Sequence, residues 1–166
     1  MQLQLPRRRY ARQVTLFENN SYVRLLNLLL QMELGCIELY QTCSTELNNY
    51  RLLDIIDCHR LQAKSLVNLI ISNRGIPEHK GFAFSSELSL MASRIGRRLP
   101  HTLARRTSVA SCLQLEKSLR RRYRQALAIA PYRDRIELNA HILSTRQHIN
   151  HLQTRDEQDS STIEPS

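Results

Sequence analysis

The sequence predicts an all-α protein that folds as a bundle of four long helices. Gly (4), Pro (5) and aromatic residues (5%) are scarce among the 166 residues, a composition that favours helices over a sandwich or a barrel. Apolar residues recur at alternating steps of three and four along four segments, which is the period of one helical face. A chain of this length forms one domain and buries roughly 70% of its unfolded surface, so a single core is expected.

The first two helices are expected to form a hairpin. We place the first helix over about residues 21–47 and the second over about residues 50–73. Gly75 and Pro77 then end the second helix, because Gly favours a helix C-terminus and Pro cannot continue a helix. The connection near residues 48–49 is so short that the two helices should lie antiparallel.

A second hairpin follows a long connection. Residues 75–107 form this crossover, which contains a short helix over about residues 87–98. The third long helix is capped at residues 107–108 by Thr or Ser and stops before Pro131. The fourth covers about residues 133–153. Two helical hairpins joined by one long crossover describe one of the known topologies of the four-helix bundle.

Both ends of the chain differ from the bundle in composition. We expect a basic N-terminal arm over residues 1–19, the bundle over residues 20–154, and a disordered tail over residues 155–166. The tail is polar and lacks apolar periodicity, so it cannot bury a core. The N-terminus lacks the apolar segment of a secretory signal. No apolar run approaches the ~20 residues that span a bilayer.

The four cysteines show no spacing typical of a metal or redox motif. Cys36, Cys43, Cys58 and Cys112 lie inside apolar helical patterns, where a free cysteine behaves as a small hydrophobe. A reducing compartment is therefore expected, and the prediction is a cytoplasmic protein.

The chain is strongly basic, with a net charge of +9 and a pI near 9.9. Arginine supplies all but three of the 24 basic side chains, and its planar guanidinium binds phosphates well; a bias in genomic base composition produces the same excess. Non-specific binding of nucleic acid or an anionic membrane is one hypothesis, although these clusters lack interleaved aromatic residues for base stacking. The arginines concerned are Arg7, Arg8, Arg9, Arg97, Arg98, Arg105, Arg106, Arg120, Arg121, Arg122 and Arg124.

Polar residues fall on the core-facing stripe of each long helix. A carboxylate or imidazole buried among apolar residues must be paired, neutralised or bound to a metal. The main candidates are Glu33, His59, Glu116 and His148, with Gln62 and His141 as secondary candidates. The four stripes are Leu26, Leu30, Glu33, Ile37 and Tyr40; Leu52, Ile56, His59, Ala63, Leu66 and Ile70; Cys112, Glu116, Leu119, Tyr123, Leu127 and Ala130; and Leu138, His141 or Ile142, Thr145, His148 or Ile149, and Leu152.

The depth of these residues in the bundle is a second reason to group them. In antiparallel helices, positions equidistant from the turn lie at one level, with a rise of about 1.5 Å per residue. Reflecting Glu33 through the first turn lands near His59, and reflecting Glu116 through the second turn lands near His148. The four candidates are therefore expected in one layer.

A structural alternative needs no metal. Glu116 would pair with Arg120 one turn further along the helix, and Glu33 would hydrogen-bond to His59 across the core. Under this alternative the four polar residues are a satisfied core network.

Two stretches of the chain carry a family resemblance. NRGIPEHKG, at the end of the second helix, is similar to a Gly-x-Pro-Glu connection, and CLQLEKSLRRRYRQAL is similar to a helix of the form C-E-x-G-E-x-x-A-x-x-x-Y-x-x-A-L. Together they resemble the bacterial ferritin-like bundle proteins of unknown function that are distantly related to rubrerythrins. The resemblance covers roughly residues 21–153 and implies a ferritin-like bundle. The second motif matches at Cys112, Glu116, Tyr123, Ala126 and Leu127.

The resemblance also implies a set of metal ligands. Ferritin-like di-iron proteins use one Glu from each of two helices and a Glu-x-x-His pair from each of the other two. Glu33 and Glu116 match the single glutamates, and His148 matches one histidine. Where the two pairs would stand, the chain has HRLQ at residues 59–62 and TRQH at residues 145–148, so two carboxylates are missing. The implied site is a degenerate di-iron site that holds at most one divalent ion, iron or zinc.

Three functions remain open from the sequence. We expect a ferritin-like bundle without a demonstrable reaction, associated with stress or with protein interactions, that keeps part of a metal layer and has no catalytic residue. The alternatives are a basic adaptor for nucleic acid or anionic membranes, and a metal-dependent oxidoreductase, which the missing carboxylates disfavour. A homodimer is also expected, because the first helix carries a second apolar stripe of Leu25, Leu28, Met32, Cys36 and Leu39.

Overall fold

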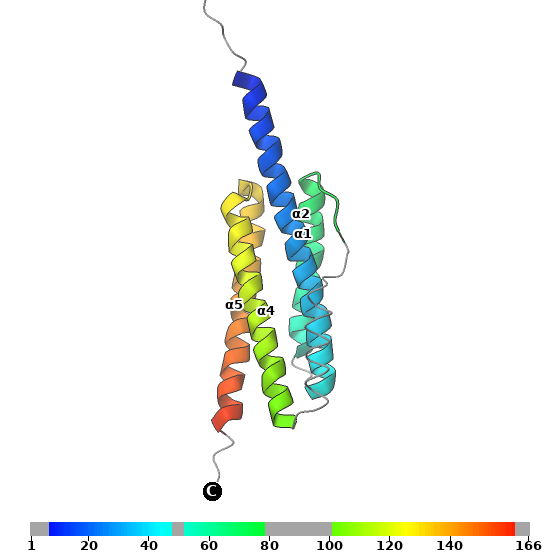
Figure 1. Cartoon of the computed structure of the whole chain (residues 1–166), viewed down its shortest axis with the longest axis vertical. Coiled ribbons are helices and arrows are strands. Elements are labelled where there is room, and N and C mark those ends of the chain that lie inside the picture. The colour runs from blue at the N-terminus through cyan, green and yellow to red at the C-terminus, as the bar shows by residue number, and fades with distance from the viewer. Residues whose placement is uncertain (1–6, 48–51, 79–100, 162–166) are drawn as a thin grey trace, which may run out of the picture.

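In the computed structural model, residues 7–47, 52–78 and 101–161 are described, and their side chains over residues 21–44, 52–78 and 107–154. All regular structure in these ranges is helical, which confirms the all-α prediction. The long helices lie alongside one another as a bundle, with the start of the first helix projecting beyond one end (Figure 1). The elements are α1 (Arg7–Leu47), α2 (Leu52–Ser72), α4 (His101–Ile129), the 3-10 turn η1 (Tyr132–Asp134) and α5 (Arg135–Ser161).

The four helices form two antiparallel hairpins. α1 packs most extensively against α2, α4 packs against α5, and α1 also packs along α4, whereas α2 and α5 touch only slightly. Figure 1 shows that α2 ends at one end of the bundle and α4 begins at the other, so α2 and α4 run in the same direction. Of the pairs of long helices in contact, α2 and α5 lie against each other over the shortest stretch. The short helix expected over residues 87–98 lies outside the described residues.

Three helix ends differ from those expected from the sequence. α1 begins at Arg7 instead of near residue 21, so most of the expected basic arm is helical. α4 begins at His101, directly after Pro100, instead of at residues 107–108. α5 continues to Ser161, so more than half of the expected disordered tail is helical. In each case no Pro or Gly interrupts the additional segment, and helix propagation costs little once a helix has been nucleated.

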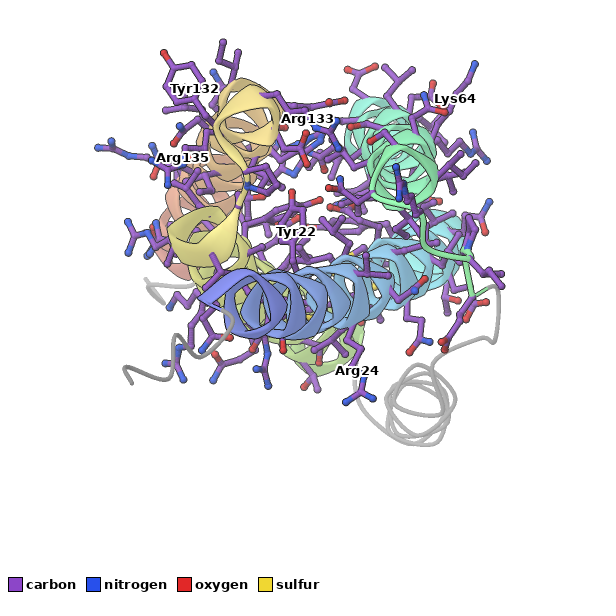
Figure 2. All side chains as sticks on the ribbon, turned by 90° about the horizontal axis from the view of Figure 1, so that it is seen from above. Tyr22, Arg24, Lys64, Tyr132, Arg133 and Arg135 are labelled. Carbon is purple, nitrogen blue, oxygen red and sulfur yellow. The ribbon has the colours of Figure 1, made fainter. Side chains whose placement is uncertain are left out.

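The core-facing stripes predicted from the apolar period are confirmed on all four helices. The large side chains with 0–1% exposure include Leu30 of α1, Leu66 of α2, Leu119 of α4 and Leu152 of α5. Of the stripe residues, Ile37, Leu127 and Ile142 are only partly buried against this core. Figure 2 shows Tyr22 pointing into the space between the helices, while Arg24, two residues later, points away from it.

The end of α2 has a left-handed residue one position before the glycine that was expected to end it. The Gly75 amide donates to the Ile70 carbonyl at 2.8 Å and the Arg74 amide donates to the Ile71 carbonyl at 2.9 Å, the pattern of a Schellman motif. Arg74 therefore takes the left-handed conformation, with φ of 60°. Gly75 is needed for space, because a Cβ there would lie 2.4 Å from Val23 Cγ1 of α1.

Polar contacts connect this end of α2 to the turn between α4 and α5. Asn73 Nδ2 donates to Asp134 Oδ2 at 2.7 Å, and both side chains are buried. Arg133 donates to the Ser72 carbonyl at 3.0 Å and to Asn73 Oδ1 at 3.1 Å. Because hydrogen bonds to charged groups are stronger than neutral ones, this cluster fixes the depth of the second hairpin against the first.

None of the described helices is both long enough and apolar enough to cross a membrane.

Candidate metal centre

Each of the four long helices contributes one polar side chain to the same layer of the core. Glu33, His59 and Glu116 have 0% exposure, and His148 has 7%. These are the four residues that the helical stripes and the depth argument grouped together. On α1, α2 and α4 the neighbouring positions on the stripe are apolar, and on α5 they are Thr145 and Leu152, both buried, so the helices that bury the core also carry these groups inward.

His59 lies between two carboxylates. Its Nδ1 atom is 2.6 Å from Glu33 Oε2, and its Nε2 atom is 3.0 Å from Glu116 Oε1. A carboxylate oxygen only accepts hydrogen bonds, so both ring nitrogens must carry a proton when the two carboxylates are ionised. In this arrangement His59 is an imidazolium that links α1 to α4.

Glu116 is the centre of the layer, and its two oxygens have very different surroundings. Oε1 accepts a hydrogen bond from Tyr40 at 2.9 Å and lies 3.0 Å from His59 Nε2 and 3.2 Å from His148 Nδ1. Oε2 is buried and has no hydrogen-bond partner among the described residues. A buried carboxylate oxygen without a partner is costly, so this atom marks a position where a ligand would be stabilised.

The charges of the layer shift the pKa values of its members. Burial alone would lower the pKa of His59, but the Glu33 charge and hydrogen bonds to both carboxylates raise it to about 10. Burial would also lower the pKa of His148, and its contacts with Cys58 and Glu116 raise it to about 9. Burial would raise the pKa of Glu116, and hydrogen bonds from the two histidines lower it to about 2. Without a metal, the layer thus consists of paired charges.

Three of these residues have the arrangement of a metal site. One ligand atom from each of His59, Glu116 and His148 can be chosen so that all three lie within 4.8 Å of one another, and all three residues are buried. Glu33 is not in this group, because it contacts the opposite nitrogen of the His59 ring. Two histidines and one glutamate are a ligand set that zinc and iron(II) accept, with one position left open.

A ring of hydroxyl and amide groups surrounds these side chains. The Tyr123 hydroxyl donates to Glu33 Oε1. With its amide nitrogen directed at Glu33, Gln62 lies 3.2 Å from Glu33 Oε1 and accepts a hydrogen bond from Ser144 Oγ at 3.2 Å. Gln62, a secondary metal candidate, therefore supports Glu33 through its nitrogen, which is not a metal donor.

His141, the other secondary candidate, lies outside the group. Its Nε2 atom is 2.8 Å from Ser65 Oγ on α2, and Ser65 also donates to Glu137. Burial lowers the pKa of His141. His141 is thus hydrogen-bonded to Ser65 and packs against the ring of Tyr123, and it is not one of the three residues that converge.

The metal-free alternative predicted two pairs, Glu33 with His59 and Glu116 with Arg120, and the structure contains the first pair but not the second. Glu33 does pair with His59. Glu116, however, forms its contacts with His59 and His148, and the partly buried Arg120 is not among its partners. The arginines at positions 121, 122 and 124 are exposed, as expected for a solvent-facing side of α4.

Sequence reasoning assigned Tyr40 and Tyr123 to the core but missed their role in the site. Both are on the predicted stripes, and both hydroxyls donate to a glutamate of the layer. The available signal was their spacing: Tyr40 follows Glu33 by seven residues and Tyr123 follows Glu116 by seven, which is two helical turns. Each tyrosine reaches the glutamate of the other helix.

Comparison of the chain with known protein families and with curated proteins finds no match.

Proposed function

We propose that this protein is a metal-binding helical bundle whose core holds one divalent ion between His59, Glu116 and His148. The observation that carries the proposal is Glu116, which contacts both histidines through one oxygen while its other buried oxygen has no partner in the described part of the chain. An ion among these three residues would replace the protons that His59 and His148 direct at Glu116 Oε1. It would also supply a positive charge for the carboxylate to bind.

The spacing of the donors supports a small ion. In a tetrahedral zinc site with bonds of about 2.0 Å, neighbouring donor atoms are about 3.3 Å apart. The two histidine nitrogens lie 3.0 and 3.2 Å from Glu116 Oε1. Two of the three donor separations are thus close to the tetrahedral value, the third is within 4.8 Å, and three protein ligands leave one coordination position open.

Charge balance supports a divalent ion in particular. In the metal-free layer, two imidazolium groups balance the carboxylates of Glu33 and Glu116. One divalent ion with two neutral histidines balances the same two carboxylates. Exchanging two protons for one such ion therefore leaves the net charge of the buried layer unchanged, which avoids the cost of an unpaired charge in the core.

Glu33 has a different role in this proposal. Its carboxylate accepts a hydrogen bond from His59 Nδ1, so that Nε2 is the nitrogen directed at the ion. Metal-binding histidines are commonly fixed in this way by a carboxylate on the other ring nitrogen. Glu33 is thus a positioning residue, not a ligand.

We further propose a ferritin-like ancestry for this bundle, as the resemblance implies. The pairing of two hairpins, with one inward ligand-type residue from each helix, supports this assignment. Of the residues that the structure describes, two carboxylates lie in the layer, which is too few to bridge two irons, so the proposed centre is mononuclear and no oxidoreductase activity is assigned. A stress-associated role and a cytoplasmic location are proposed on the sequence alone.

The test is metal analysis of the full chain purified without a histidine tag and then equilibrated with zinc or iron(II). About one ion per chain is expected in the wild type, and none in the Glu116→Gln and His148→Gln variants. The His141→Gln variant is the matched control, since it removes a buried histidine of α5 outside the layer. The proposal is wrong if wild type binds no ion, or if all four proteins bind equally.

Binding of polyanions remains a second proposal, supported by the exposed Arg121, Arg122 and Arg124 on α4. Retention on DNA should fall steeply with salt if these residues bind phosphates, and reversing the three charges should abolish it. Retention that is unchanged by either treatment rejects the proposal.

The homodimer also stays a prediction, although Met32, Cys36 and Leu39 of its expected stripe are buried in the chain's own core.

A further inference from the structure

The outer side of His148 carries a second set of donor atoms that the proposed metal centre does not use. His148 Nδ1 faces Glu116, and on the other side of the ring Nε2 lies 3.5 Å from Ser144 Oγ. Ser144 Oγ in turn lies 2.9 Å from Cys58 Sγ. His148 therefore separates two sets of donors, an inner set with Glu116 and His59 and an outer set with Ser144 and Cys58.

The outer set is more exposed to solvent than the inner residues of the centre. Cys58 on α2 and Ser144 on α5 are both half-buried, and these are the two helices that touch only slightly. The side chains of His59 and Glu116 have 0% exposure, whereas that of His148 has 9%. An ion that reaches the centre from solvent would therefore meet Cys58 and His148 before it meets Glu116.

We propose that Cys58 is an entry ligand that captures a divalent ion at the seam between α2 and α5 and passes it to the inner site through His148. This inference rests on the proposed metal centre. The ion first binds Cys58 Sγ and His148 Nε2, and the thiol proton and the Nε2 proton leave to water. On transfer the bonds from the ion to Sγ and Nε2 break, and these two atoms take up protons from water. The ion then binds His148 Nδ1, His59 Nε2 and Glu116, the protons on those two nitrogens leave to water, and no electrons are exchanged.

Cys58 is not a permanent ligand in this scheme. Among the described residues, the group that converges is His59, Glu116 and His148, and Cys58 is not part of it. A thiolate binds zinc and similar ions well, so a sulfur that is reached first but left behind would speed entry without adding to the final affinity. Ions that prefer oxygen, such as magnesium, should gain nothing from Cys58.

Cobalt(II) is the probe for the test, since a sulfur–cobalt bond absorbs in the near ultraviolet and a nitrogen–oxygen site absorbs in the visible. After rapid mixing with the full chain, the sulfur band should appear first and decay as the visible bands grow. The Cys58→Ser variant should lack the transient band and bind cobalt about tenfold more slowly, with an unchanged final affinity. Ser65→Ala is the matched control, because Ser65 is half-buried on the same seam and contacts His141 instead of the ligands.

The outcomes separate this inference from the function on which it rests. If wild type takes up cobalt at the same rate as Cys58→Ser, and without a transient sulfur band, the entry role is wrong while the centre stands. If the sulfur band persists at equilibrium, Cys58 is a resident ligand and the inference is again wrong. If wild type takes up no cobalt, the metal centre itself fails, and the inference fails with it.

Discussion

Glu33 and Glu116 contact opposite nitrogens of the His59 ring, at 2.6 and 3.0 Å, and therefore occupy different positions in the layer. Both carboxylates are fully buried, yet only Glu116 converges with His148 as well. The two glutamates are equivalent in the sequence resemblance, but under the proposed function Glu116 is a ligand and Glu33 orients His59.

This division predicts unequal effects when each glutamate is neutralised. Glu116→Gln should abolish zinc binding, whereas Glu33→Gln should weaken it by about 10–100-fold, as is typical when the partner of a histidine ligand is changed. Competition against a chromophoric chelator measures both affinities. Equal losses in the two variants would make Glu33 a ligand, and an unchanged affinity in Glu33→Gln would remove its positioning role.

The metal-free protein should be most stable in a limited pH range. The pKa of Glu116 falls from 4.5 to about 2, so its contribution to the free energy of unfolding is present above pH 4.5 and is lost as the pH falls toward 2. The pKa values of His59 and His148 rise from 6.5 to about 10 and about 9, so their contributions are complete below pH 6.5 and are lost as the pH rises through those values. Maximum stability is therefore expected between about pH 4.5 and 6.5.

Urea unfolding across pH tests this expectation. Zinc should remove the decline on the basic side, because it binds the two histidines in their neutral form. Glu116→Gln should flatten the decline on the acid side. A metal-free stability that keeps rising from pH 6.5 to 9 would contradict the assigned protonation of the two histidines.

At the end of α2, the free energy of unfolding should respond in opposite directions to two neighbouring substitutions. Arg74→Gly should raise it by about 1 kcal/mol, because a residue with a Cβ is strained in the left-handed region. Gly75→Ala should lower it, since the new Cβ would overlap Val23. Thermal unfolding measures both variants; destabilisation by Arg74→Gly would contradict the left-handed conformation of Arg74, and stabilisation by Gly75→Ala would contradict the close approach of Val23 to Gly75.

The contact between Asn73 and Asp134 should matter more than an exposed ion pair. Asp134→Ala would leave the buried Asn73 amide short of an acceptor and should cost about 1–3 kcal/mol. Asp57→Ala is the control, because Asp57 pairs with Arg60 at 2.7 Å on the surface and should cost about 0–1 kcal/mol. Equal losses in chemical denaturation would show that the cluster does not hold the two hairpins together.

The inward faces of the helices could be predicted because apolar burial imposes one period along each helix. That period placed Glu33, His59, Glu116 and His148 inside, and the equal depth of antiparallel positions placed them in one layer. Neither argument gives the direction of a side chain within the layer. Which nitrogen of His59 faces which glutamate depends on rotamers set by packing, so the separate role of Glu33 was not predictable.

The helix ends were less predictable, because a cap is a local signal that competes with tertiary contacts. Thr107 can cap a helix, but α4 begins six residues earlier, after Pro100, which the sequence offers as a break. At the end of α2, glycine is the residue that most easily adopts the left-handed conformation, but Arg74 adopts it instead. A glycine is needed at position 75 because Val23 approaches the backbone closely there. A contact between residues 52 positions apart cannot be read from the local sequence.

The central claim is that His59, Glu116 and His148 together bind one divalent ion. The most direct measurement is a crystal structure of the full chain with zinc, with diffraction recorded on both sides of the zinc absorption edge. We expect one anomalous peak within bonding distance of His59 Nε2, His148 Nδ1 and a Glu116 oxygen, with Glu33 still hydrogen-bonded to His59 Nδ1. Crystals in which zinc lies only elsewhere, with Glu116 still hydrogen-bonded to both histidines, would contradict the claim.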